Sequence, residues 1–149
     1  MAQPVTARFG KFRVLLGNDA TPTVYAAPCG FTSKALNLIK NLAEIEIPDC
    51  ADPDAAVDLA RDVQSKDWNI SGEGLLAAGS VDAWLDAYDS SASVPVKVEI
   101  EFSSGTVTFV GHAHLSNFGM SAERAGRVTV SVEMQGDGAL VKTSTIPGA

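Results

Sequence analysis

Alternation of apolar and polar residues is the feature that most restricts the fold of this chain. Over residues 94–102 apolar side chains occupy every second position, and a lysine and two glutamates alternate with the last of them. Successive side chains of a strand point to opposite faces, so a period of two predicts a half-buried strand. Residues 126–134 alternate in the same way, and Gly136-Asp137-Gly138 is expected to end that strand.

Other segments extend the predicted sheet. Ser103-Ser104-Gly105 is typical of a turn, so residues 106–118 should return as the second strand of a hairpin. Residues 12–17 are expected to open the sheet, and residues 68–72 show a shorter alternation. The 149 residues are therefore predicted to form a single, mainly β domain.

One helix is expected over about residues 80–90. Ser80 is a suitable N-cap, and Asp82 would lie in the first turn, where the helix dipole favours an acid. One apolar face has helical spacing and is predicted to pack on the core: Val81, Trp84, Leu85 and Tyr88.

Two stretches are ambiguous. Residues 33–46 have both helical propensity and a period-two alternation. A long acidic loop is expected at about 48–65, and within it residues 53–62 have the Asp-Pro start of a short helix. A connection this long in a compact β domain usually has a function of its own.

Charge is unevenly distributed. The chain has 18 acids and 11 lysines and arginines, with a pI near 4.6, which disfavours a protein that grips a nucleic-acid backbone. Between Glu44 and Asp62 seven acids accompany a single base, Arg61. The N-terminal stretch is the reverse, because Arg8, Lys11 and Arg13 precede the first acid.

No catalytic, cofactor-binding or metal-binding residue is predicted. His112 and His114 share one strand face but lack further ligands nearby in sequence, and no nucleophile or phosphate-binding motif is present. No signal peptide or membrane-spanning segment is expected. Cys29 and Cys50 are therefore predicted to be free thiols.

The order of these elements resembles the major tail tube protein family of siphophages, in particular the tube subunit of gene transfer agents and related prophages. The resemblance covers nearly the whole chain. Its most specific part is the ending, in which a glycine-bearing turn at 119–126 separates two strands and the second closes in Gly136-Asp137-Gly138-Ala139.

The resemblance implies an antiparallel β-sandwich or half-barrel with one flanking helix, which closes into a β-barrel on oligomerisation. It implies that residues 33–46 form a strand. It also implies a virion structural protein without catalytic activity, which forms stacked hexameric rings through which DNA passes without specific binding. The implied partners are further copies of the chain, a tape-measure protein, a tail terminator and distal tail or baseplate proteins. The implied location is the tail of a virion or phage-like particle, assembled in the host cytoplasm.

Two sets of residues are expected to serve such a tube. The lumen-lining candidates lie on polar strand faces: Glu99, Glu101, Thr129, Ser131 and Glu133. The ring-stacking candidates pair the acidic loop with the basic N-terminal stretch: Asp49, Asp52, Asp54, Asp58, Arg61, Arg8, Lys11 and Arg13. The alternative function is a monomeric β-barrel that binds a small ligand or carbohydrate in an apolar interior pocket.

Overall fold

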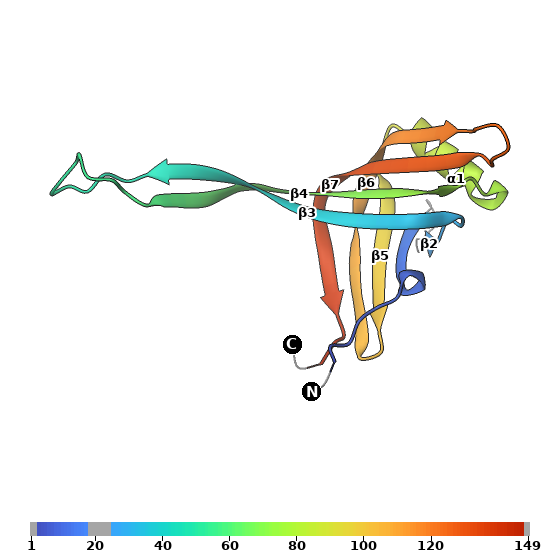
Figure 1. Cartoon of the computed structure of the whole chain (residues 1–149), viewed down its shortest axis with the longest axis horizontal. Helices are drawn as coiled ribbons and strands as arrows, with labels where there is room; N and C mark the ends of the chain where they lie inside the picture. Colours follow the sequence, from blue (N-terminus) through green and yellow to red (C-terminus); the bar gives the residue numbers. More distant parts are fainter. Residues whose placement is uncertain (1–2, 18–24, 148–149) are drawn as a thin grey trace.

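A computed structural model describes residues 3–17 and 25–147, which form one antiparallel sheet and one α-helix (Figure 1). The sheet has seven strands in the order β2-β1-β5-β6-β7-β4-β3. The elements are η1 (Phe9–Lys11), β1 (Phe12–Gly17), β2 (Tyr25–Ala26), β3 (Phe31–Glu46), β4 (Leu59–Leu75), α1 (Ala78–Asp89), β5 (Val94–Phe102), β6 (Gly105–Ser121) and β7 (Thr129–Ser144). This confirms a mainly β fold with a flanking helix. The sheet is not closed, because β2 and β3 are its two edges.

The strongest alternation corresponds to the centre of the sheet. β5 spans the predicted residues, and Val96 and Val98 are almost completely buried because they face the core. β5 pairs with β1 on one side and with β6 on the other, so Val98 lies opposite both Val14 and Phe109. β1 also begins and ends where the sequence predicted. Residues 18–24, between β1 and β2, lie outside the described residues.

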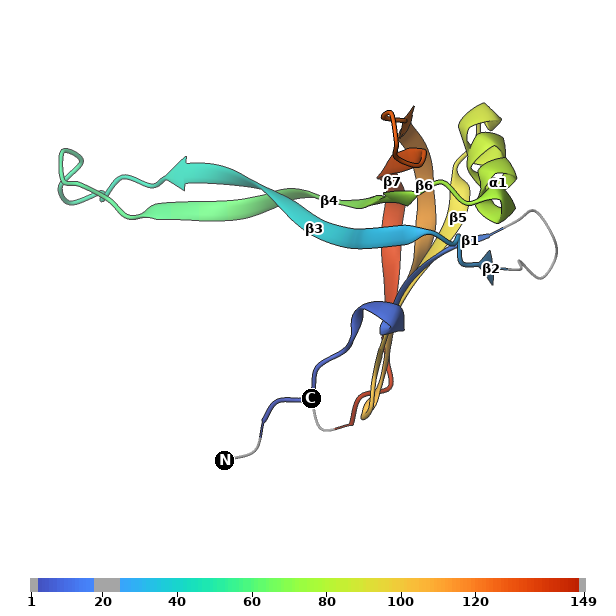
Figure 2. The same ribbon diagram turned by 45° about the vertical axis from the view of Figure 1, so that its right-hand side comes forward.

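β6 and β7 are long, and both contribute to the two halves of the sheet (Figures 1 and 2). One half contains β1 and β5, and the other contains β4 and β3. β6 shifts register twice against β7, after Val110 and after Leu115. Register shifts of this kind bend a strand, so the sheet folds over its own core. The predicted end of β7 at Gly136 is wrong, because the strand continues through the glycines to Ser144.

The core lies between the bent sheet and α1. Trp84 of the helix is 3% exposed and packs edge-on against Phe31, with 5.8 Å between ring centroids. Its indole also lies 6.0 Å from the ring of Phe118. The remaining buried core comes from several strands: Leu16, Trp68, Ile70, Val96, Val98, Ala113, Val130, Val132 and Met134.

The helix differs from its prediction in register. Ala77 is the N-cap, whereas Ser80 is buried within the first turn and its hydroxyl donates to the Ala77 carbonyl at 3.1 Å. Ser80, Trp84 and Ala87 form the buried face. Leu85 and Tyr88 point outward, with Tyr88 67% exposed, so their assignment to the core was wrong. Short residues at 80 and 87 let the helix backbone approach the sheet, and this turns the bulkier side chains away.

The two ambiguous stretches belong to one long hairpin. Residues 33–46 are strand throughout, as the resemblance implied, and they pair with β4 along its length. Residues 53–62 are not helical: 53–55 form a turn, and β4 begins at Leu59. The acidic connection is therefore a loop of residues 47–58 rather than 48–65, because residues 59–65 pair with residues 41–46.

Candidate assembly interface

An arm of two strands projects from the body of the subunit (Figure 1). β4 pairs with β7 only from Asn69 onward, so residues 59–68 have β3 as their single partner. We call residues 37–68, with the loop 47–58 at their far end, the arm. An isolated two-stranded hairpin is at best marginally stable in water. The outer arm therefore receives little stabilisation from the rest of the sheet.

Apolar side chains are exposed along the arm. Leu38 is 58% exposed and Ile47 is 65% exposed. The full set of large exposed apolar residues on the arm comprises Leu38, Ile39, Leu42, Ile45, Ile47, Leu59 and Val63. Large exposed apolar side chains that gather on one part of a soluble protein indicate an interaction site. The arm is therefore a candidate surface for contact with a neighbouring molecule.

Polar pairs across the arm keep its two strands in register. The Asn37 amide donates to the Asn69 side-chain oxygen at 2.9 Å, and the Asn41 amide donates to the Ser65 hydroxyl at 2.9 Å. Further out, Arg61 and Glu44 form an ion pair of 3.5 Å. Exposed pairs each contribute only a few tenths of a kcal/mol to about 1 kcal/mol. They define the register of the hairpin without burying its apolar surface.

The structure brings the predicted acidic stacking residues together at the end of the arm. Asp49, Asp52, Asp54 and Asp58 all lie in the loop 47–58, and Arg61 lies on the adjoining part of β4. The Asp49 carboxylate accepts the backbone N–H of Ala51 at 2.9 Å. We call residues 44–62 the acidic tip. It also contains Glu44, Glu46 and Asp62, which the predicted set left out although the same clustering of acids in the sequence includes them.

The predicted basic stacking residues lie elsewhere, near η1 and β1. Arg13 donates to the carboxylates of Glu99 at 3.2 Å and Glu101 at 3.1 Å, and Lys11 lies 3.8 Å from Glu101. Arg8 precedes η1 and has no ion pair among the described residues. Within one subunit the structure does not bring these three cations to the acidic tip.

The lumen candidates lie on the sheet face that points away from the core. On β7, Thr129, Ser131 and Glu133 alternate with buried Val130, Val132 and Met134. Glu99 and Glu101 alternate in the same way on β5, although both are engaged by Arg13. The register adds neighbours that the sequence prediction missed: Ser71 and Asn117 beside Glu133, and Glu73 beside Ser131. We call this surface the polar sheet face. The alternation of residues 70–73 around buried Ile70 carried a signal for two of these neighbours.

The family described as phage tail tube protein matches residues 7–142, which is most of the chain. The chain belongs to this family. None of the curated proteins compared matches the chain.

Chains in solved structures of a virion, a tail tube and a baseplate share the fold of this tail tube protein. A chain in the virion of a native gene transfer agent particle superposes with a TM-score of 0.70 at 13% identity, covering 93% of this chain and 99% of that chain. A chain of the SPP1 tail tube superposes with a TM-score of 0.67 at 14% identity, covering 95% of this chain and 81% of that one. A chain of the anti-feeding prophage baseplate superposes with a TM-score of 0.64 at 14% identity, covering 96% of this chain and 97% of that chain. Membership in the family gives this chain a structural, tube-forming role.

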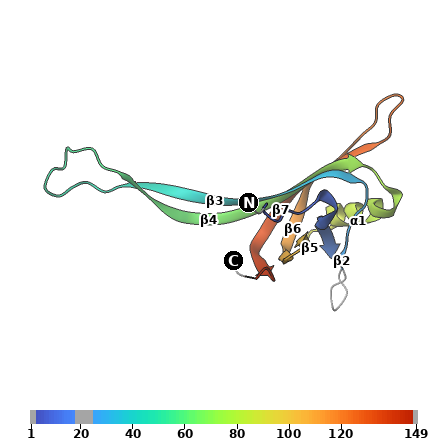
Figure 3. The same ribbon diagram turned by 60° about the horizontal axis from the view of Figure 1, so that its bottom comes forward.

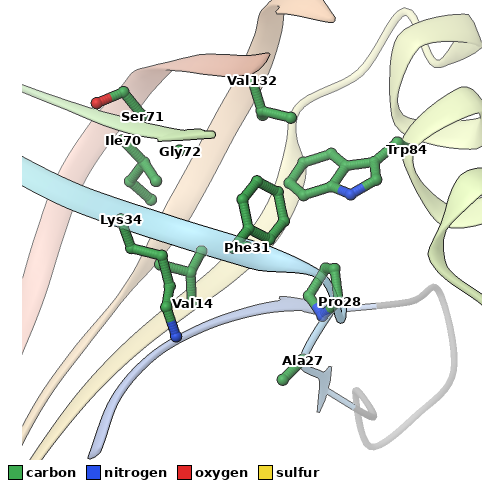
Figure 4. Close-up of a pocket in the computed structure, with 10 residues that line it drawn as sticks. All are labelled: Val14, Ala27, Pro28, Phe31, Lys34, Ile70, Ser71, Gly72, Trp84 and Val132. Atoms are coloured by element: carbon green, nitrogen blue, oxygen red, sulfur yellow. The ribbon is translucent and has the colours of Figure 1, made fainter. Parts of the chain in front are cut away.

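A small cavity lies in the interior of the tail tube protein, between α1 and the sheet. Figure 4 shows Val14, Phe31 and Trp84 around it. Its volume is about 30 Å³, room for a few water molecules, whereas small-molecule sites occupy roughly 300 Å³ or more. This cavity therefore gives no support to the binding-module alternative.

Lys34 closes one side of this cavity and joins β3 to the N-terminal segment. Its ammonium donates to the Phe12 carbonyl at 2.7 Å and lies 4.4 Å from the centre of the Phe9 ring. Burial lowers the pKa of Lys34 below 10.5, and the nearby Arg13 lowers it further. Lys34 thus contributes to packing between the two halves of the sheet.

His114 of the tail tube protein lies beside a carboxylate. His114 Nε2 lies 3.4 Å from an Asp137 carboxylate oxygen, and both side chains are about half exposed. Over residues 3–17 and 25–147 no group of three or more His, Cys, Asp or Glu is placed to hold a metal ion. The same residues include no helix with the length and apolar composition needed to span a membrane. Cys29 and Cys50 are exposed and not bonded to each other.

Proposed function

We propose that this protein forms hexameric rings that stack into the tail tube of a virion or phage-like particle, and that DNA passes through the tube. The observation that carries the proposal is the arm, whose exposed apolar side chains and two-stranded construction require a covering neighbour. In this role the protein is structural and performs no catalysis.

Unpaired sheet edges support the formation of a ring. β3 is an edge strand of 16 residues, and the opposite edge is formed by the two-residue β2 and the unpaired remainder of β1. Long open edges favour pairing with another chain, and closing a barrel removes them. Pairing between copies would convert the open sheet of one subunit into part of a continuous barrel.

The polar sheet face is the proposed lining of the lumen. It lies opposite the side that α1 and the core cover, and it includes Glu99, Glu101, Thr129, Ser131 and Glu133. An acidic lining repels a phosphate backbone, and a neutral lining does not bind it, whereas clustered lysines and arginines would retain it. This chemistry supports passage of DNA without specific binding.

The acidic tip is the proposed contact between successive rings. Asp49, Asp52, Asp54 and Asp58 lie at the end of a projection that leaves the body of the subunit, so they reach beyond it. The distribution of charge in the sequence suggests Arg8, Lys11 and Arg13 as their partners. In the subunit, Lys11 and Arg13 already contact Glu99 or Glu101, which leaves Arg8 as the least engaged of the three.

Other partners are proposed from the resemblance to the tail tube family. A tape-measure protein inside the tube, a terminator at one end and distal tail or baseplate proteins at the other are proposed to contact this chain. Assembly is proposed to take place in the cytoplasm of the host.

The test compares the purified protein with a variant that lacks the outer arm. Residues 42–64 are replaced by an Asn-Gly turn, which suits a two-residue hairpin and keeps the Asn41–Ser65 pair. The whole chain should form rings and tubes in electron micrographs, while the variant should keep the circular dichroism of a folded β protein and form no tubes. A whole chain that stays monomeric at high concentration would overturn the proposal, as would normal tubes from the variant.

A further inference from the structure

We propose that a lysine-rimmed groove at the base of the arm is the receptor for the acidic tip of a second copy of this chain. The inference rests on the proposed tube and names the surface that receives the arm.

The groove forms where the arm and β7 separate. β7 pairs with β4 as far as Gln135 and then bends away along β6, while the arm continues in its own direction (Figure 3). The corner between them encloses a groove of about 920 Å³. Its apolar lining includes Leu38, Trp68 and Leu140, and its charged lining comprises Lys40, Lys66, Lys142 and Asp67. We call it the basic groove.

The three lysines gather on one side of the molecule. Lys40 and Lys66 are directly opposite each other in the β3–β4 ladder, so their side chains leave the same face of the arm. Leu38 and Trp68, two positions nearer the body, share that face. Lys142 comes from β7 across the corner, two positions after Leu140.

Within the described chain these three lysines have no ion-pair partner, and Asp67 is the one acid beside them in the groove. The Asp67 carboxylate accepts the backbone N–H of Trp68 at 2.8 Å. Like charges directly opposite each other in a sheet are destabilising. An acidic segment that enters the groove would remove this repulsion.

The acidic tip matches the groove in charge and in apolar character. It carries seven acids and one arginine, and Ile47 and Leu59 are exposed beside them. Glu46, the last paired residue before the loop 47–58, lies six positions beyond Lys40 on β3, so the loop begins roughly 20 Å beyond the groove of its own subunit. Because the arm extends away from the body, its tip reaches the groove of another copy instead.

The other cationic sites fit the tip less well. Lys11 and Arg13 already contact Glu101, and Arg8 beside them is a single exposed cation. Arg124 and Arg127 lie in the exposed turn between β6 and β7. The basic groove combines unpaired cations with an apolar floor, which neither site offers, so it is the better receptor.

Charge reversal on each side of the contact tests the inference. The exposed Lys66 and Lys142 are changed in Lys66→Glu/Lys142→Glu, which should raise the protein concentration needed for tubes at least tenfold. Adding Asp52→Lys/Asp54→Lys at the tip should restore most of that loss. Arg124→Glu/Arg127→Glu is the matched control and should assemble at the wild-type concentration.

A cross-link locates the contact directly. In a Cys29→Ser background, Ala139→Cys places a thiol in the groove, and the natural Cys50 is exposed in the tip. Mild oxidation of tubes should give a ladder of disulfide-linked oligomers on a non-reducing gel, whereas Ala122→Cys in the same background should not.

Failure of the groove and failure of the tube are distinguishable. If tubes form but Lys66→Glu/Lys142→Glu assembles as wild type, or the tip reversal fails to rescue it, the groove is not the receptor and the tube function stands. Tubes that link Cys50 through Ala122→Cys and not through Ala139→Cys lead to the same conclusion. A wild-type chain that never polymerises overturns both proposals.

Discussion

The indole nitrogen of Trp68 donates a hydrogen bond to the carbonyl oxygen of Gly138 at 3.1 Å, and the indole ring lies directly against Gly136. Trp68 is the last arm residue of β4 before that strand joins β7, and the two glycines mark the point where β7 bends. A single side chain therefore connects the base of the arm to the bend of the sheet, and this contact defines the direction in which the arm leaves the body.

Gly136→Ala should destabilise the subunit. A Cβ at this position would lie 2.4 Å from Trp68 Cε2, so the indole or β7 must move, at a cost of about 1–3 kcal/mol in free energy of unfolding. Urea denaturation followed by tryptophan fluorescence measures the change. Gly79→Ala is the control, because a Cβ there meets no atom within 4 Å and a helical position favours alanine by about 0.5–1 kcal/mol. Equal stability of Gly136→Ala and wild type would show that the contact is not tight.

Thiol labelling should separate the polar sheet face from the helix. In a Cys29→Ser/Cys50→Ser background, Glu133→Cys lies on the polar face, and Tyr88→Cys lies on the outward side of α1. Inside tubes, both thiols should react with a small maleimide, but only the one at 88 should react with a bulky polyethylene-glycol maleimide. Monomers should label at both positions with both reagents. Rapid bulky labelling of Glu133→Cys in intact tubes would place that face outside the lumen.

Salt should weaken stacking more than ring closure. The proposed stacking contact joins exposed charges, and raising the salt from about 0.1 M to about 1 M shortens the Debye length from about 10 Å to about 3 Å. Ring closure would use backbone hydrogen bonds, which salt screens less. Sedimentation across this range should show tubes dissociating into rings or short stacks before subunits appear. Direct conversion of tubes into monomers would contradict this order.

Lys34 should give the subunit a stability that rises with pH in the alkaline range. Burial and Arg13 lower the pKa of Lys34 in the folded state, so unfolding takes up a proton between that pKa and 10.5. The free energy of unfolding of wild type, relative to Lys34→Met, should therefore increase as the pH rises toward 10.5, and this contribution should be lost as the pH falls through the folded pKa. Denaturation of both proteins at several pH values measures the trend. A constant difference would show that Lys34 is as well solvated as in the unfolded chain.

The central hairpin was predictable because one face of it is buried. Val96 and Val98 alternate with polar residues on a strand that has one wet and one dry side, so the sequence pattern and the structure coincide. β3 was ambiguous for the opposite reason. Most of its outer half is exposed on both faces, and a strand without a buried side leaves no clear period in the sequence.

Tertiary contacts account for the features that the pattern did not predict. Gly136 and Gly138 are typical of a strand end, but here Gly136 makes room for the indole, and the Gly138 carbonyl accepts its hydrogen bond. The acids of the tip were evident in the sequence, whereas the basic groove was not. Its lysines come from positions 40, 66 and 142, and only the β3–β4 register and the bend of β7 bring them together.

Because the arm and the groove are different surfaces, their contact has a direction. A heterologous contact repeated along a stack leaves one surface unused at each end, and the two unused surfaces are not the same. One end of the tube would present empty lysine-lined grooves, and the other would present free acidic hairpins with exposed isoleucine and leucine. The polymer would therefore be polar, and the proteins that cap its two ends would need different surfaces. One would supply an acidic, partly apolar segment, and the other would supply a basic recess.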